Sequence, residues 1–196
     1  MEKVFDALID SFIENKIGIS EFFLSKKLST ELSANLHTHF KHGNLTLAGT
    51  GTKAKINNSD LVRGDKIYWL DQSHDNKSEN VFLGMMDAMV IYLNRTCYTG
   101  ITDYEFHYTL YEIGTYYKKH IDQFTTNDRR KYSVIVYLNE DWQTEDGGEL
   151  SLKINHQTVK INPTAGKCVF FKSNEIEHEV LVTHKNRLSI TGWLKV

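Results

Sequence analysis

The sequence is poor in the residues that stiffen or cross-link small folds: one proline and two cysteines occur among 196 residues. With only Cys97 and Cys168 present, a disulfide framework is not expected, and a reduced, cytoplasmic setting is the default. The first six residues, MEKVFD, alternate charged and apolar side chains and lack the long apolar run of a signal peptide. No stretch approaches the ~20 apolar residues of a membrane span, so we expect no membrane partner.

A strong net charge is also missing. The 23 Lys and Arg residues nearly balance the 25 Asp and Glu residues, and the net charge of −2 gives no general attraction for nucleic acid. Hydrophobic residues make up 40% of the chain, and its length falls in the range of about 100–200 residues usual for one domain. No repeat, low-complexity run or linker interrupts it. We therefore expect a single domain over 1–196.

Apolar periodicity divides the chain into two parts. Helical spacing predicts helices over 3–15, 26–41 and 79–94, the last behind Ser78 as N-cap, and short strands over 16–23 and 63–70. From residue 100 onward the pattern becomes that of short strands with polar turns, which indicates a β-sandwich or jelly roll. The predicted fold is mostly β, with helical support at about 1–97 and a jelly-roll core (double-stranded β-helix) at about 100–196. The expected strands are 103–112, 115–121, 132–138, 148–154, 157–161, 167–171, 178–182 and 187–195.

Segment 43–62 lies between these parts and is rich in Gly, Thr, Asn and Lys, with almost no bulky apolar residues. Such a composition predicts a long loop or hairpin. Long loops in compact domains are often lids or binding loops. A lid over a binding site and a plain connector are equally consistent with this segment.

Three residues of the second part form a candidate metal site. Because residues i and i+2 of a strand project from one face, His120 and Asp122 can point at one spot. His178 follows 58 residues later, enough chain to cross a jelly roll and return. Two histidines and one carboxylate with open positions opposite them suit a non-haem Fe(II) that binds O₂ and a cosubstrate.

Arg187 begins a strand in which Ser189, Thr191 and Trp193 share its face. An arginine among apolar residues, with no charge partner in view, suits a dianionic carboxylate ligand held by two parallel hydrogen bonds. The competing interpretation is an ordinary salt bridge from Arg187 to a glutamate, with His178 on the surface. A zinc hydrolase is the main chemical alternative. The sequence has no His-Glu-x-x-His motif for it, however, and this alternative would leave Arg187 without a role. His107 could also touch the pocket, although a half-buried neutral histidine is the simpler reading.

Four segments carry a family resemblance: RGDKIYWL at 63–70, His120-Ile121-Asp122, VYLNEDW at 136–142 followed by Gly147-Gly148-Glu149-Leu150, and HEV at 178–180 with Arg187 and Trp193. Together they resemble the 2-oxoglutarate- and Fe(II)-dependent prolyl hydroxylases of the prolyl 4-hydroxylase superfamily, in the branch of the oxygen-sensing (HIF-type) enzymes and their bacterial relatives. The resemblance covers about 16–196. An arginine at 187 is similar to this branch, whereas the collagen-modifying relatives have a lysine there. Trp193 stands where the nucleic-acid-demethylating branch usually has a second arginine.

The resemblance implies roles for individual residues. His120, Asp122 and His178 would ligate Fe(II). Arg187 would bind the distal carboxylate of 2-oxoglutarate, helped by Tyr137 and Thr191, with Tyr111 near the metal-bound end. The apolar wall would consist of Ile135, Leu150, Val180 and Trp193. Asp65 and Arg130 fall where the family has a salt bridge at the base of the loop.

The resemblance further implies an activity. The chain would be a 2-oxoglutarate-dependent dioxygenase that hydroxylates a prolyl residue of a protein substrate held by loop 43–62. The reaction would require Fe(II), 2-oxoglutarate and O₂, and its co-products would be succinate and CO₂. L-ascorbate is a further cofactor that the resemblance allows. Two alternatives stay open: a hydroxylase of a small molecule or free amino acid, and a non-catalytic jelly-roll sensor that retains the iron site.

Overall fold

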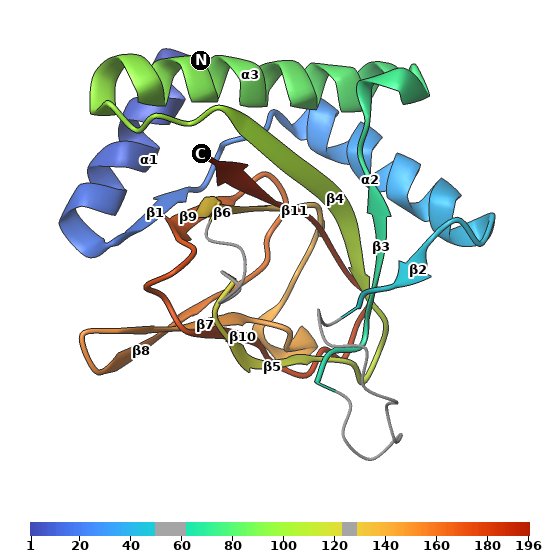
Figure 1. The fold of residues 1–196 in the computed structure, drawn as a ribbon. Helices are drawn as coiled ribbons and strands as arrows, with labels where there is room; N and C mark the ends of the chain where they lie inside the picture. Colours follow the sequence, from blue (N-terminus) through green and yellow to red (C-terminus); the bar gives the residue numbers. More distant parts are fainter. Residues whose placement is uncertain (50–61, 123–128) are drawn as a thin grey trace.

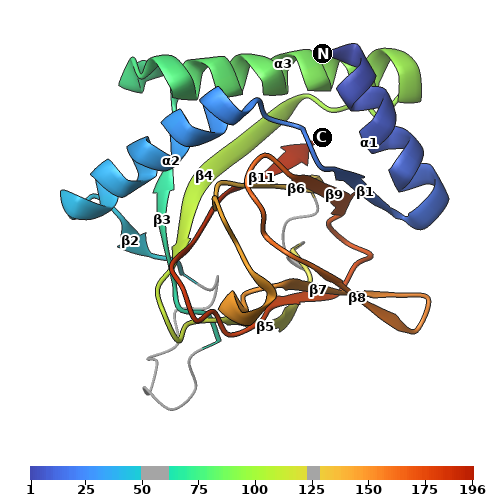
Figure 2. The same ribbon diagram turned by 180° about the vertical axis from the view of Figure 1, so that it is seen from behind.

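The computed structural model describes residues 1–49, 62–122 and 129–196. Two antiparallel sheets face each other, and three helices cover the outer face of the larger sheet, as Figure 1 shows. The view from behind shows the same three layers, with the helices on one side and the smaller sheet on the other (Figure 2). The larger sheet thus lies between the helices and the smaller sheet.

The three helices are α1 (Glu2–Asn15), α2 (Lys26–Lys41) and α3 (Lys77–Cys97). The side chain of Ser25 accepts a hydrogen bond from Leu28 N and so starts α2. Asn76, rather than the predicted Ser78, caps α3, because its side-chain oxygen accepts from the backbone of Ser78 and Glu79. No helix in the described part of the chain is long and apolar enough to cross a membrane.

The larger sheet has the strand order β1-β9-β6-β11-β4-β3-β2, and the smaller sheet has the order β5-β10-β7-β8. All described pairings between these strands are antiparallel. The strands are β1 (Ile17–Ser20), β2 (Thr46–Leu47), β3 (Asp65–Trp69), β4 (Asp103–Tyr111), β5 (Tyr117–His120), β6 (Arg130–Tyr137), β7 (Leu150–Ile154), β8 (Gln157–Ile161), β9 (Cys168–Lys172), β10 (His178–Val180) and β11 (Arg187–Lys195).

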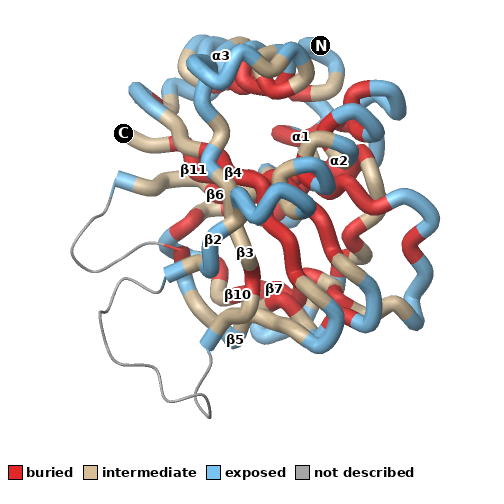
Figure 3. The backbone as a smooth tube through the Cα atoms, turned by 90° about the vertical axis from the view of Figure 1, so that its right-hand side faces the viewer, coloured by how far each residue is buried: buried red, intermediate tan, exposed pale blue. Residues whose placement is uncertain are grey.

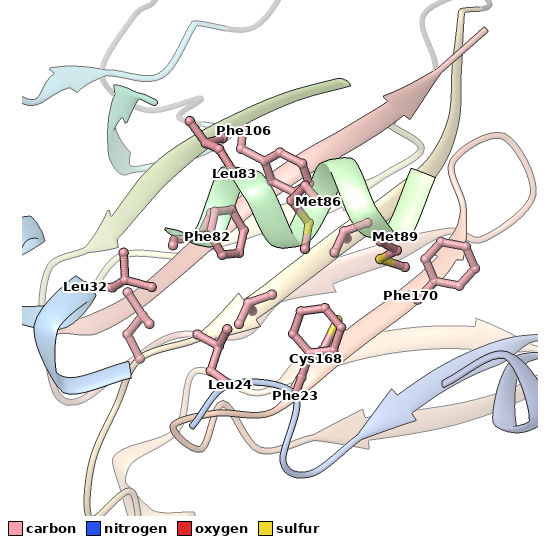
Figure 4. Packing of buried hydrophobic residues seen from close by; sticks show 14 of the residues in the cluster. Phe23, Leu24, Leu32, Phe82, Leu83, Met86, Met89, Phe106, Cys168 and Phe170 are labelled. Carbon is pink, nitrogen blue, oxygen red and sulfur yellow. The ribbon is translucent and has the colours of Figure 1, made fainter. Parts of the chain in front are cut away.

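Two hydrophobic clusters hold the layers together. The first joins the helices to the larger sheet: the ring of Phe82 of α3 packs edge-on against Phe106 with centroids 5.3 Å apart, and Met86, Met89 and Phe170 belong to the same cluster (Figure 4). The second lies between the two sheets and includes Leu150 and other residues of the smaller sheet. The buried backbone in Figure 3 accordingly runs through the middle of the larger sheet, which is covered on both faces. A sheet covered on both faces can carry a polar site on one face without losing its core.

The predicted jelly roll with N-terminal helices is confirmed, and each of the eight strands expected after residue 100 is present. Of segment 43–62, Thr46–Leu47 forms the edge strand β2, paired with β3. Residues 50–61, on which the lid and substrate-holding expectations mainly fall, lie outside the described residues.

Candidate metal centre and adjoining pocket

Strand register brings His120, Asp122 and His178 together. His120 ends β5 and lies directly opposite His178, the first residue of β10. Asp122 follows two residues after His120, so its carboxylate reaches the same spot. Its Oδ1 lies 3.4 Å from His120 Nε2, and its Oδ2 lies 3.6 Å from His178 Nε2. One potential ligand atom from each residue lies within 4.8 Å of the other two, a spacing that could hold one metal ion.

Both imidazoles are oriented by a backbone carbonyl. His120 Nδ1 lies 2.8 Å from Lys118 O, and His178 Nδ1 lies 3.0 Å from Ile176 O. A carbonyl oxygen only accepts, so each Nδ1 carries a proton, and each Nε2, which faces Asp122, is the nitrogen available to a metal. Metal-binding histidines commonly have such a hydrogen bond from the nitrogen that does not bind the metal, because it fixes both the tautomer and the ring orientation.

The carboxylate of Asp122 is held in its ionised form. Burial would raise its pKa, but the two histidines and a hydrogen bond from Ser133 outweigh burial and hold the pKa well below its usual range. Ser133 Oγ donates to Asp122 Oδ2 over 2.6 Å and contacts Ser173 Oγ over 2.9 Å. The pKa of His178 is lowered, primarily by burial. A neutral imidazole and an ionised carboxylate are the forms that bind a metal.

A cavity of about 390 Å³ opens beside the three ligand atoms. This volume lies within the range of ~300–1,000 Å³ that is usual for small-molecule sites. Tyr137 does not line the cavity, whereas the other predicted residues do. These are Tyr111, His120, Asp122, Ile135, Leu150, His178, Val180, Arg187, Thr191 and Trp193.

Arg187 lines this cavity and is 1% exposed. Its Nε donates to Gly148 O over 2.8 Å, but its terminal NH2 is buried without a hydrogen-bond partner. Within the described ranges no carboxylate forms an ion pair with it, so the interpretation as an ordinary salt bridge is wrong. His178 is only 4% exposed, so it is not on the surface either. A buried guanidinium needs an anionic partner, and a ligand carboxylate fits this position.

Two phenols accompany the guanidinium. The rings of Tyr111 and Tyr137 lie 5.1 and 5.0 Å from the Arg187 guanidinium carbon. Burial raises the pKa of Tyr137 to about 12, and it raises the pKa of Tyr111 well above its usual value. Both phenols are therefore neutral near pH 7. The Tyr137 hydroxyl is buried without a hydrogen-bond partner in the described structure, behind the guanidinium rather than at the cavity wall.

One expected contact is absent. The Asp65–Arg130 salt bridge that the resemblance implied is not formed: Asp65 pairs with Arg63 through bonds of 2.7 and 2.5 Å. Arg130 instead pairs with Glu105 over 2.7 Å, and its guanidinium carbon lies 3.4 Å from the centre of a Trp193 ring. Arg63 is two residues from Asp65 along an extended chain, so both point the same way and pair locally.

The sequence left several wall residues without a role. Tyr117 stacks on the His120 ring with the centroids 3.5 Å apart, and Arg63 covers the other side of Tyr117. Ser133 contacts Asp122, and its place on the strand face of Ile135 was the available signal. Trp69 also lines the cavity, and so does His107, which the sequence predicted to be half-buried and which is 2% exposed. Cross-strand neighbours of this kind depend on register between segments far apart in sequence, which no local pattern gives.

Comparison with known proteins agrees with this geometry. A family model described as the 2OG-Fe(II) oxygenase superfamily matches residues 106–195. Human Egl nine homolog 1 is 27% identical over 202 residues, which covers 91% of this chain and 44% of that protein. The rat protein of the same name is 26% identical over 194 residues, 91% of this chain and 55% of that protein. The chain thus spans about half the length of these curated relatives.

Two solved structures cover nearly the whole chain. A Pseudomonas putida prolyl-4-hydroxylase is 33% identical, with a TM-score of 0.88 over 97% of this chain and 98% of that one. A prolyl hydroxylase from Trichoplax adhaerens, in complex with a peptide of the hypoxia inducible factor oxygen degradation domain, is 26% identical. Its TM-score is also 0.88, over 99% of this chain and 90% of that one.

Proposed function

The chain belongs to the 2OG-Fe(II) oxygenase superfamily, and from this premise we propose that it hydroxylates a prolyl residue of a protein substrate at carbon 4. It is a 2-oxoglutarate-dependent dioxygenase whose cofactors are Fe(II) and 2-oxoglutarate. The observation that carries the proposal is the similarity to the Pseudomonas putida prolyl-4-hydroxylase, which extends over nearly all of both chains. The Trichoplax adhaerens enzyme adds a peptide as the kind of substrate.

The rim of the cavity also favours a polypeptide. Leu47, Trp69 and Ile121 line the cavity and are 70%, 46% and 47% exposed. Exposed apolar side chains gathered at the mouth of a polar site are typical of a surface that binds another molecule. A peptide that covers them would bury apolar area while its target residue enters the cavity.

The groups of the cavity divide the work between them. When bound, Fe(II) and 2-oxoglutarate would supply the oxidising chemistry by which the substrate, O₂ and 2-oxoglutarate give hydroxylated product, succinate and CO₂. His120, Asp122 and His178 would hold the iron on one face and leave the opposite side open. Arg187 would bind the distal carboxylate of 2-oxoglutarate, helped by Tyr137, whose ring lies 5.0 Å from the guanidinium carbon and supports it from behind.

The remaining wall residues would shape the pocket. Ile135, Leu150, Val180 and Trp193 are each at most 7% exposed and would keep water away from the cosubstrate. Thr191 Oγ1 accepts a hydrogen bond from Thr109 over 3.2 Å, which leaves its own proton for a ligand. Tyr111, which also lines the cavity, would contact the metal-bound end of the cosubstrate. The protein thereby contributes position and a dry site.

The test is incubation of the iron-loaded protein with 2-oxoglutarate, O₂ and a pool of peptides that carry a central proline with varied flanks. We expect mass spectrometry to find one added oxygen on the proline and amino-acid analysis to identify 4-hydroxyproline, with succinate in equal amount. An Asp122→Ala variant should give neither. Hydroxylation of free amino acids or other small molecules but of no peptide would overturn the proposal, and so would the absence of any turnover.

A further inference from the structure

His107 is a wall residue of the cavity to which the proposed function gives no role. It lies on β4 with Thr109 and Tyr111, and alternation along the strand points all three at the cavity. In the sheet it lies opposite Trp69 of β3 and Thr191 of β11, which line the same cavity. Its position is therefore set by the centre of the larger sheet.

The imidazole of His107 is held between two indoles. Its ring meets Trp69 edge-on with centroids 4.9 Å apart and an interplanar angle of 80°. Trp193 lies on another side at 5.6 Å and 53°. The residue is 2% exposed. A ring packed in this way has one orientation, so its two nitrogens face fixed directions.

Hydrogen bonds determine which nitrogen of His107 carries the proton. Nδ1 lies 3.1 Å from Tyr108 O, which can only accept, so Nδ1 is the donor. Nδ1 also lies 3.0 Å from Thr109 Oγ1, and that hydroxyl in turn donates to Thr191 Oγ1 over 3.2 Å. Burial lowers the pKa of His107 to about 4, so the ring is neutral near pH 7. Nε2 therefore presents a lone pair.

This lone pair has no partner in the protein. Among the described residues nothing hydrogen-bonds to His107 Nε2, although Nδ1 makes two contacts. His107 lines the cavity, so a ligand in the cavity lies beside its ring. A second metal site is not indicated, since the described part of the chain contains one cluster with metal-binding spacing, at His120, Asp122 and His178. A neutral acceptor at the wall of a substrate cavity calls for a donor from the substrate.

We propose that His107 Nε2 accepts a hydrogen bond from a backbone N–H of the substrate peptide next to the target proline, and so selects how the peptide enters. This inference rests on the proposed function. Proline itself has no backbone N–H, so the donor must come from a neighbouring residue. The backbone amide is the donor that peptides of different sequence share. His107 would then fix the register of the peptide while the indoles contact its apolar parts.

The experiment measures peptide affinity with Fe(II) and 2-oxoglutarate under anaerobic conditions, where turnover cannot occur. The probe is the peptide that wild-type protein hydroxylates fastest in the pool described above, labelled for fluorescence anisotropy. A series of its derivatives carries an N-methyl group on each flanking amide in turn. The variants are His107→Leu, which removes the acceptor, and His107→Gln, whose amide oxygen can stand near the position of Nε2.

We expect one N-methyl position to weaken binding to wild-type protein about tenfold, the loss of one hydrogen bond. His107→Leu should bind the unmodified peptide about tenfold more weakly, and the same N-methyl group should then have no further effect. His107→Gln should restore most of the affinity and the sensitivity to that methyl group. Thermal unfolding and iron titration of each variant identify damage elsewhere in the site.

The inference is overturned if His107→Leu binds the peptide as tightly as wild type, or if each N-methyl group has the same effect in both proteins. In those cases the wild-type protein still hydroxylates the peptide, and the proposed function stands. Absence of hydroxylation of any peptide by wild-type protein would instead overturn the proposed function, and this inference with it.

Discussion

Ser133→Ala tests whether the carboxylate of the metal centre is oriented from behind. Ser133 Oγ donates to Asp122 Oδ2 over 2.6 Å, and both side chains are buried. The substitution removes this donor and one small polar atom, and it leaves the β6 backbone intact. Asp122 then keeps the two histidines as neighbours but loses the hydrogen bond that holds its carboxylate in one orientation. We expect the metal affinity to fall while the fold is retained.

The magnitude follows from the kind of hydrogen bond that is lost. Hydrogen bonds to charged groups contribute about 1.5–3 kcal/mol. Removal of a group that orients a metal ligand typically weakens metal binding by about 10–100-fold, or roughly 1.4–2.7 kcal/mol. The two ranges agree, so a loss of about 30-fold is expected for Ser133→Ala. Ser173, whose hydroxyl contacts Ser133 at 2.9 Å, should contribute less because it does not touch Asp122.

The assay is a calorimetric titration with Fe(II) under anaerobic conditions, carried out on the wild-type protein and on the serine variants. Ser151→Ala is the matched control: Ser151 is also buried on a strand and donates to a carboxylate, that of Glu179, over 3.2 Å, but outside the cavity. It should leave iron binding unchanged. If Ser133→Ala binds iron as tightly as wild type, the hydrogen bond does not orient Asp122 and this reasoning fails.

Three further predictions concern the cosubstrate pocket, the loops that Asn139 connects and the metal centre. Arg187→Met should weaken 2-oxoglutarate binding by about 30-fold or more while iron still binds, because two charge-assisted bonds are lost; equal affinity in calorimetry would refute the carboxylate role. Asn139→Leu should lower the free energy of unfolding by about 2–4 kcal/mol in urea titrations, since Asn139 bonds Leu188 N and O and Pro163 O, and an unchanged midpoint would contradict this. In the metal-free protein, the depressed pKa of Asp122 contributes stability that is present above its unfolded value of about 4 and lost as pH falls below it. Asp122→Asn should therefore flatten the acid side of the melting-temperature profile; an unchanged acid side would show that other groups cause it.

The sequence alone allowed much of the fold to be predicted, because local periodicity is strong in this chain. Leu32 and Leu36 recur at helical spacing in α2, and both are fully buried against the sheet. Short alternating runs predict the eight later strands, which the structure contains. The joint position of His120 and Asp122 could be foreseen from the same period of two residues. Helices, strands and the shared face of residues i and i+2 depend on neighbouring residues, so periodicity along the sequence predicts them.

Features that depend on register between distant strands could not be predicted in this way. The pairing of Asp65 with Arg63 excludes the expected bridge to Arg130, and only the structure shows that Glu105 takes the place of Asp65 beside Arg130. The same holds for Tyr117, which stacks on His120 in the smaller sheet. Which side chain contacts a neighbouring strand depends on the register in which the two strands pair, and the sequence of either strand alone does not give this register.

Strand β11 shows why the site was nevertheless visible in the sequence. Leu188, Ile190 and Leu194 face the helices and join the outer cluster. Arg187 and Ser189 point the other way, between the sheets, and each has a buried polar atom without a partner. Both faces of the strand are covered, so an apolar residue at either position would stabilise the fold more simply. A chain that keeps a charge and a hydroxyl there breaks the pattern that its own fold favours, and such breaks mark the positions where binding, rather than stability, determines the residue.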